Sequence, residues 1–142
     1  MAQDISAASW RKLQKKALAA AKKAYAPYSG IQVGACLMTK KGRLFHGCNV
    51  ENASYSLTIC AERNALFSAI SSLGVQGKDP IVAIAVARLD GLSAPPCGAC
   101  RQVLYEFCAD VWISFIVQEG KWEYYRLSEL LPNAFRILPQ PF

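Results

Sequence analysis

The sequence lacks several features that would mark particular classes of protein. No stretch approaches the ~18 unbroken apolar residues that a membrane span needs, and the N-terminal "MAQDISAASWRKLQKK" has no apolar segment of the kind that export signals carry. Linker-like, repeated and low-complexity stretches are also missing. We therefore expect one domain, residues 1–142, that lies in the cytoplasm and has no membrane partner.

Histidine is almost absent, whereas cysteine is not. The single histidine, His46, lies far along the chain from the cysteine motifs, so we expect a structural or surface role for it. The six cysteines do not indicate three disulfides, because an export signal is missing and 142 residues can bury about 68–70% of the unfolded chain's surface unaided. Free thiols and metal ligands are favoured, with Cys36, Cys48 and Cys108 expected as small buried hydrophobes.

The formal net charge of +6 is concentrated in one segment. Its basic residues flank an apolar stripe that recurs at three- and four-residue steps, which predicts a helix over roughly residues 6–25. Because no aromatic residues alternate with the lysines as stacking platforms for bases, a solvated helix face is favoured over a phosphate-binding patch, and a nucleic-acid partner is not expected. The basic residues are Arg11, Lys12, Lys15, Lys16, Lys22 and Lys23; the stripe is Trp10, Leu13, Ala17, Ala20 and Ala24.

Apolar runs and turn signals predict the remaining elements. Two strands are expected around the turn-like "TKKG", in "IQVGACLM" and "GRLFHGCNV", and then a helix from "CAERNALFSAISS" that ends at Gly74. A strand covered on both faces is predicted in "IVAIAVA", a helix in "CGACRQVLYEFC", a strand in "VWISFIV", a hairpin in "QEGKWEYY" and a short helix in "LSELLP". This order indicates an α/β fold, with a mixed sheet between helices on both faces.

Three cysteines have the spacing of a metal site. Cys97 and Cys100 stand three residues apart at the start of one predicted helix, and Cys60 opens another. With one strand between these helices, both helix N-termini are expected at the same sheet edge, where α/β folds place their sites. Three thiolates suit Zn²⁺ and leave a fourth position open, as in catalytic zinc sites. The helix dipoles and Arg63 would offset the excess negative charge.

Glu62 follows Cys60 by two residues, at the start of the same predicted helix. Taken alone, a carboxylate there stabilises the positive end of the helix dipole. Beside three convergent cysteines it is better suited as a base that takes a proton from water and passes it to a substrate nitrogen. Such proton transfer is typically worth ~10²–10⁴ in rate.

These residues carry a resemblance to a known family. The segments "CAE" (residues 60–62) and "PCGAC" (residues 96–100) resemble the signature of zinc-dependent nucleoside and nucleobase deaminases, in the all-cysteine form of the small homotetrameric cytidine deaminases. The resemblance extends through "YAPYSGIQVGACL", "GCNVENASYSLTICAERNAL", "PPCGACRQ" and "ELLPNAF". It implies a three-layer α/β/α sandwich with a five-stranded mixed sheet, one Zn²⁺ per chain, and a homotetramer with shared active sites.

The resemblance also implies roles for individual residues. Asn49 and Glu51 match the pair that holds the ribose hydroxyls. Tyr55 and Phe135 match side chains that complete a neighbouring subunit's pocket, and Ile31 takes the place of a common aromatic contact to the base. The implied set is Cys60, Cys97 and Cys100 for the zinc, Glu62 for proton transfer, Arg63 and Arg101 for charge balance, and Asn49, Glu51, Ala61, Ile31, Tyr55 and Phe135 for the substrate.

The implied reaction is hydrolytic deamination of cytidine and 2′-deoxycytidine to uridine and 2′-deoxyuridine, with ammonia released, as a step of pyrimidine salvage. Water attacks C4 of cytosine, while Glu62 protonates N3 and then the departing amine. Three alternatives remain open. A deaminase of the same fold would act on another aminopyrimidine, such as a blasticidin-type antibiotic, although the "NVEN" match favours a ribose. An RNA- or DNA-editing deaminase would need a segment that grips flanking nucleotides. A structural-zinc interaction module would close the site with a fourth ligand such as Cys48.

Overall fold

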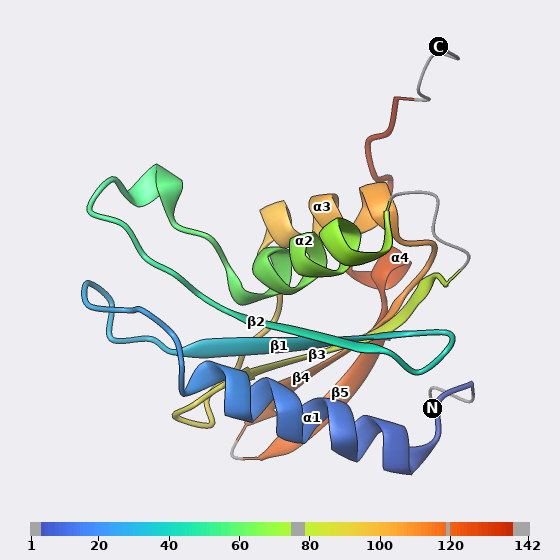
Figure 1. Cartoon of the computed structure of the whole chain (residues 1–142), viewed down its shortest axis with the longest axis horizontal. Coiled ribbons are helices and arrows are strands. Elements are labelled where there is room, and N and C mark those ends of the chain that lie inside the picture. The colour runs from blue at the N-terminus through green and yellow to red at the C-terminus, as the bar shows by residue number, and fades with distance from the viewer. Residues whose placement is uncertain (1–3, 75–78, 119, 138–142) are drawn as a thin grey trace.

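A five-stranded sheet forms the middle layer of the molecule, with the strand order β2-β1-β3-β4-β5 (Figure 1). The computed structural model describes residues 4–74, 79–118 and 120–137. β3 and β4 pair in parallel, and the other neighbours pair antiparallel, so the sheet is mixed as predicted. The strands are β1 (Val33–Thr39), β2 (Leu44–Cys48), β3 (Ile81–Arg88), β4 (Trp112–Gln118) and β5 (Lys121–Arg126).

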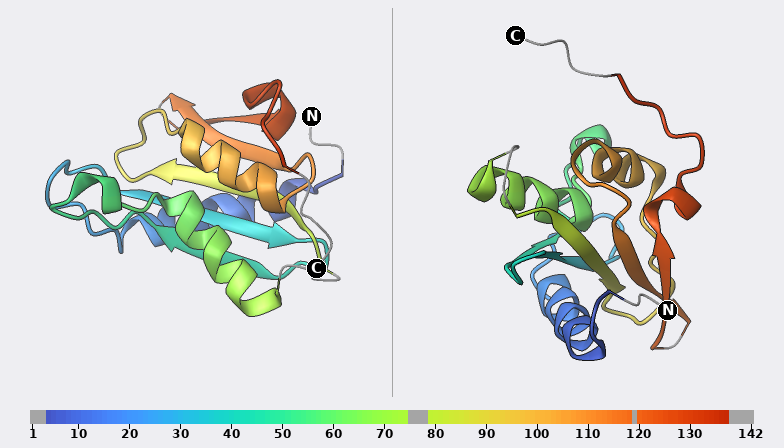
Figure 2. Two further views of the ribbon diagram at one scale, coloured as in Figure 1. Left: turned by 90° about the horizontal axis from the view of Figure 1, so that it is seen from above. Right: turned by 90° about the vertical axis from the view of Figure 1, so that its right-hand side faces the viewer.

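Helices cover both faces of this sheet. α1 lies alone on one face, and the other three α-helices lie on the opposite face (Figures 1 and 2). The predicted α/β/α sandwich is therefore confirmed. The helices are α1 (Ala7–Ala21), α2 (Ala61–Leu73), α3 (Gly98–Phe107) and α4 (Leu127–Leu130), with the 3₁₀ helix η1 (Tyr55–Leu57) ahead of α2.

α1 begins at an N-cap and ends earlier than the predicted residue 25. The Ser6 hydroxyl accepts the Ser9 N–H at 3.1 Å, which satisfies one free donor of the first turn. After Ala21 the chain turns away, because the Tyr25 N–H donates to the Asn49 carbonyl at 3.0 Å and joins the segment beyond β2. The apolar stripe is buried against β1 and β3 as predicted within α1, but its last predicted member, Ala24, lies beyond the helix and is half-buried.

β3 is buried on both faces as predicted, and its successive side chains alternate between two core clusters. Ala83, Ala85 and Ala87 pack in the cluster under α1, while Ile84 and Val86 belong to the cluster under α2 and α3. Small residues therefore let α1 approach the sheet closely.

Two glycines bring helices close to the sheet. A Cβ at Gly34 would lie 2.0 Å from the Ala17 carbonyl oxygen of α1, and a Cβ at Gly47 would lie 2.5 Å from the Ala65 nitrogen of α2. Only a residue without a side chain fits either contact.

Among the described residues, no helix combines the length and apolar character needed to cross a bilayer.

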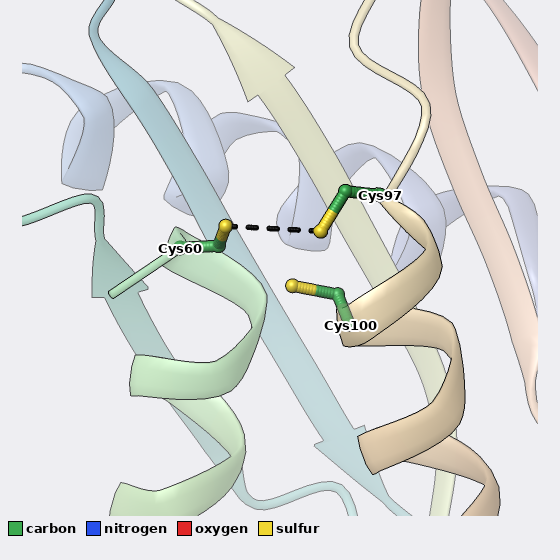
Figure 3. Close-up of side chains that lie close together, drawn as sticks. All are labelled: Cys60, Cys97 and Cys100. Carbon is green, nitrogen blue, oxygen red and sulfur yellow. Dashed lines mark hydrogen bonds between the residues drawn. The ribbon is translucent and has the colours of Figure 1, made fainter. Parts of the chain in front are cut away.

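The parallel pair determines where a site can form. β3 and β4 are joined through α3, the crossover that a parallel pair requires. α2 and α3 lie on the same face of the sheet, and their N-termini lie side by side (Figure 3).

Candidate metal centre and active site

Three cysteine sulfurs converge where α2 and α3 begin (Figure 3). Cys60 is the N-cap of α2, Cys97 is the N-cap of α3, and Cys100 lies in the first turn of α3. Their Sγ atoms all lie within 4.8 Å of one another, and those of Cys60 and Cys97 are 3.9 Å apart. Cys100 is buried, Cys60 half-buried and Cys97 exposed, so the cluster opens to solvent on one side.

This donor set fits zinc. A tetrahedral ion with Zn–S distances of ~2.3 Å separates its sulfurs by about 3.8 Å, close to the 3.9 Å between Cys60 and Cys97. Soft thiolate donors select zinc over the hard cations that prefer oxygen. Cys48 is not in the cluster of three, so within the described residues the fourth ligand required for a closed structural site is not supplied by this cysteine.

Positive groups surround the sulfurs and favour thiolate. The N-termini of α2 and α3 both point toward the cluster, and the Arg63 Nη2 lies 3.5 Å from the Cys60 sulfur. A hydrogen bond from the Cys100 thiol, helped by Arg63 and Cys97, lowers the pKa of Cys60 to about 5 despite its partial burial. The same hydrogen bond and burial raise the pKa of Cys100, and coordination of a metal would release the proton of this thiol.

Glu62 lies in the first turn of α2, between Cys60 and Arg63 in sequence, and is 4% exposed. Burial raises the pKa of its carboxyl to about 7, and the Cys60 thiolate acts in the same direction. The carboxyl lines a small pocket together with Cys60 and Cys97. A buried carboxyl that lines the same pocket as two candidate ligands is suited to exchange protons with a molecule bound there.

The pocket has a volume of about 260 Å³ and brings together three of the six predicted substrate residues. Asn49, Ala61 and Ile31 line it beside Glu62. Sequence reasoning missed further wall residues, for which the chain gives no chemical signal because most are small or aliphatic. These are Ser29, Val33, Thr58, Val86, Ala94 and Pro95.

Asn49 and Glu51 are both held by backbone groups. Asn49 Oδ1 accepts the Val33 N–H at 2.8 Å, and its Nδ2 donates to the Ile31 carbonyl at 2.8 Å. The Glu51 carboxylate accepts the N–H groups of Tyr28 and Ser29, at 3.0 and 3.1 Å. Hydrogen bonds led by the Ser29 side chain lower the pKa of Glu51, so it remains ionised. Both side chains are therefore fixed in place, and each keeps further hydrogen-bonding capacity.

Glu51 and Tyr55 line a second pocket of about 320 Å³, which shares Ser29 and Thr58 with the first. The Tyr55 ring is 75% exposed and packs edge-on against Tyr28 at 6.0 Å between centroids. Phe135 is 69% exposed and does not line either pocket of its own chain. The two aromatic side chains are thus displayed to solvent.

The two predicted charge-balancing arginines differ in what they contact. Arg63 contacts a cluster sulfur, as described above. Arg101 instead donates from Nε to the Pro96 carbonyl and from Nη1 to the Leu130 carbonyl, both at 2.8 Å. It thereby connects the peptide just before Cys97 to the end of α4.

The remaining cysteines and the histidine lie away from this cluster. Cys36 and Cys108 are buried as predicted, and burial raises their thiol pKa to about 11 and about 12. Cys48 is only half-buried, which differs from the prediction, because it ends β2 at the edge of the sheet. His46 is exposed on β2.

Comparisons with known proteins agree with this geometry. Residues 8–115 match the family described as "Cytidine and deoxycytidylate deaminase zinc-binding region". A cytidine deaminase from Halalkalibacterium halodurans is 49% identical over 124 residues, covering 87% of this chain and 91% of the relative. The crystal structure of a cytidine deaminase from Burkholderia pseudomallei superposes with a TM-score of 0.79 at 46% identity, covering 88% of this chain and 98% of that one. A blasticidin-S deaminase from Bacillus cereus is 31% identical over 108 residues, covering 72% of this chain and 76% of the relative.

Proposed function

The chain belongs to the cytidine and deoxycytidylate deaminase family, and on that basis we propose that it hydrolyses cytidine and 2′-deoxycytidine to uridine and 2′-deoxyuridine, releasing ammonia. The observation that carries the proposal is Glu62, a buried carboxyl that lines one pocket with Cys60 and Cys97. Such a reaction belongs to the salvage of pyrimidine nucleosides. The relatives of matching length named as cytidine deaminases support this substrate over a blasticidin-type one.

The residues divide the chemistry between them. Cys60, Cys97 and Cys100 would hold one Zn²⁺, which when bound supplies a Lewis acid that makes water more acidic. Glu62 accepts the proton that water gives up as its oxygen bonds to C4 of the base. Glu62 delivers this proton to N3, then takes the second proton from the oxygen now bonded to C4 and passes it to the amine as the C4–N bond breaks, so that the products are the uracil ring and ammonia.

The pocket walls orient the nucleoside. Ile31 and Ala61 offer apolar contacts to the base. Ile31 is an aliphatic side chain at the position where the family commonly has an aromatic one. Asn49 and Glu51, which backbone hydrogen bonds hold in place, are the proposed partners of the ribose hydroxyls. Arg63 stabilises the thiolate of Cys60 and keeps it available as a ligand.

Ammonia release from cytidine by the zinc-loaded protein tests the proposal. Replacement of Glu62 by Gln keeps the shape of the side chain and removes its basicity, so we expect kcat/KM to fall by at least ~10²-fold while the bound zinc is retained. Glu106→Gln on the exposed side of α3 is the matched control and should turn over like the parent. A parent that binds one zinc per chain but releases no ammonia would reject cytidine as substrate and direct attention to other aminopyrimidines.

We further propose a homotetramer in which subunits complete one another's pockets. The exposure of Tyr55 and Phe135 is consistent with this, because both rings are free to contact another subunit. Mixing a Glu62→Gln protein with a Phe135→Ala protein under subunit exchange should restore part of the activity that each has lost. Light scattering would give the mass of the assembly, and a monomer with full activity would refute shared pockets.

A further inference from the structure

The net charge of the molecule resides on the outer face of α1. Six of the sixteen basic residues lie between positions 11 and 23, a segment without an acidic residue, and the ten basic residues elsewhere are matched by the ten acidic ones. The chain outside this segment is therefore electrically neutral in total. We call the six residues the α1 basic face: Arg11, Lys12, Lys15, Lys16, Lys22 and Lys23.

The six cations share one side of the helix. At about 100° per residue, and with the turn continued past Ala21 to Lys23, they fall within an arc of about 140°. The buried residues Trp10, Leu13 and Ala17 point the opposite way, into the sheet. All six cations are exposed, and only alanines, such as Ala19, interrupt their arc. The structure thus presents one continuous positive surface.

None of these cations forms an ion pair within the described part of the chain. The ion pairs found there join Arg43 to Asp79, Arg88 to Asp90, Lys121 to Glu123 and Arg126 to Asp4, and none includes a residue of the α1 basic face. The proposed nucleoside substrate is uncharged, so the face is not explained by substrate attraction either. Six like charges on one helix repel one another, and a polyanion would relieve that repulsion.

We propose that the α1 basic face binds the phosphate backbone of double-helical nucleic acid. The segment from Arg11 to Lys23 spans about 18 Å at 1.5 Å per residue. A DNA duplex carries one phosphate per ~3.4 Å along each strand, so about five phosphates of one strand lie along that length, enough to engage about four of the cations at once. Because α1 lies flat on the sheet, it offers an outer surface to the backbone and reads no base sequence.

Two other polyanions fit less well. Single strands are usually held by aromatic residues that stack on bases, and Trp10, the one aromatic residue of α1, is buried. An anionic membrane is usually bound by a helix that inserts an apolar face, whereas the apolar face of α1 is already packed on the sheet. The absence of stacking aromatics, from which the sequence predicted no nucleic-acid partner, argues against single strands only, and duplex binding reverses that expectation.

The duplex would not reach the metal centre. α1 covers one face of the sheet, while α2 and α3, which bear the cysteines, cover the other (Figures 1 and 2). The inference is therefore of attachment to nucleic acid and not of chemistry on it. It stands apart from the proposed function, since neither the ligand nor the assay involves nucleoside turnover.

Fluorescence anisotropy with a labelled 20-base-pair duplex, titrated from about 50 to 200 mM salt, tests the proposal. With about four cations engaged at once, the slope of log K against log salt should be about −3.6, with Kd within about 10⁻⁶–10⁻⁴ M near physiological salt. The variant Lys12→Gln/Lys16→Gln should make the slope shallower by about 1.8 and weaken binding about 10- to 50-fold near 0.1 M salt.

Two matched variants distinguish the effect of charge on α1 from the effect of total charge. Lys12→Arg/Lys16→Arg keeps both charges and should bind like the parent. Lys121→Gln/Arg136→Gln removes two charges outside α1 and should leave the slope within about 0.5 of the parent's. The proposal is overturned if the parent fails to bind, if the two Gln variants lose equal affinity, or if a single strand or phosphatidylserine vesicles bind through α1 more tightly than the duplex.

Discussion

Replacing Arg101 should loosen the metal site through lost hydrogen bonds and not through lost charge. Its guanidinium donates to the Pro96 and Leu130 carbonyls, both at 2.8 Å. A hydrogen bond from a charged donor contributes about 1.5–3 kcal/mol, and because Arg101 is only half-buried we take the lower end for each. Arg101→Ala is therefore expected to lower the free energy of unfolding by about 3 kcal/mol, which lowers Tm by about 10 °C in a chain of this length.

The conservative variant Arg101→Lys distinguishes the two roles. An ammonium group is a point charge and cannot reach two carbonyls as a planar fork does, so we expect the Lys variant to lose most of what the Ala variant loses. The assays are thermal unfolding of the zinc-loaded protein and the rate of zinc release to a chromogenic chelator. Arg88→Ala, which removes an ion pair with the exposed Asp90, is the control and should lower the free energy of unfolding by about 1 kcal/mol or less. If Arg101→Lys matches the parent in both assays while Ala does not, the reasoning is refuted and charge balance is the role of Arg101.

Three further substitutions, the first with its own control, test other parts of the structure. Gly34→Ala should lower the free energy of unfolding by about 3 kcal/mol or more, because the new Cβ would lie 2.0 Å from the Ala17 carbonyl oxygen. Gly98→Ala is the control, because a Cβ there meets open space, and it should lower the free energy of unfolding by less than about 1 kcal/mol. Chemical denaturation measures both. Burial alone would raise the pKa of Asp79, but hydrogen bonds from a backbone N–H and a guanidinium outweigh it and lower the pKa. The stability contributed by Asp79 is therefore complete above the unfolded pKa of ~3.9 and is lost as pH falls through the lower folded value, so Asp79→Asn should be destabilised at pH 7 and approach the parent in acid melts. Cys97→Ser should bind zinc at least ~10-fold more weakly by competition with a chelator, and equal affinity would exclude this cysteine as a ligand.

Local pattern was sufficient to predict the order of the elements. The apolar stripe of α1, the doubly buried run of β3 and the cysteine at the start of each of α2 and α3 all express regular periodicity or capping, which adjacent residues determine. The end of α1 was misjudged by four residues because a bond between Tyr25 and Asn49, distant in sequence, competes with the helix. Such long-range competition leaves no local signal.

The sequence predicts the site residues whose side chains are unusual at their positions, but not the hydrogen bonds that polar side chains make to distant backbone groups. Cys60 and Cys97 were found because thiols at helix starts are unusual, and Glu62 because a carboxyl beside them is conspicuous. The hydrogen bonds of Arg101 to two carbonyls could not be foreseen, since any arginine next to a cysteine suggests charge balance until the backbone positions are known. Likewise, the backbone bonds of Asn49 depend on how β1 and the segment after β2 meet.

The separation of the cysteines along the chain has a consequence for the stability of the protein. Cys60 and Cys97 are 37 residues apart, and between them lie all of α2 and β3. An ion held by both acts as a cross-link that closes this loop, and its binding free energy adds to the free energy of unfolding. A substitution that releases the metal should therefore lower the free energy of unfolding as well as the activity.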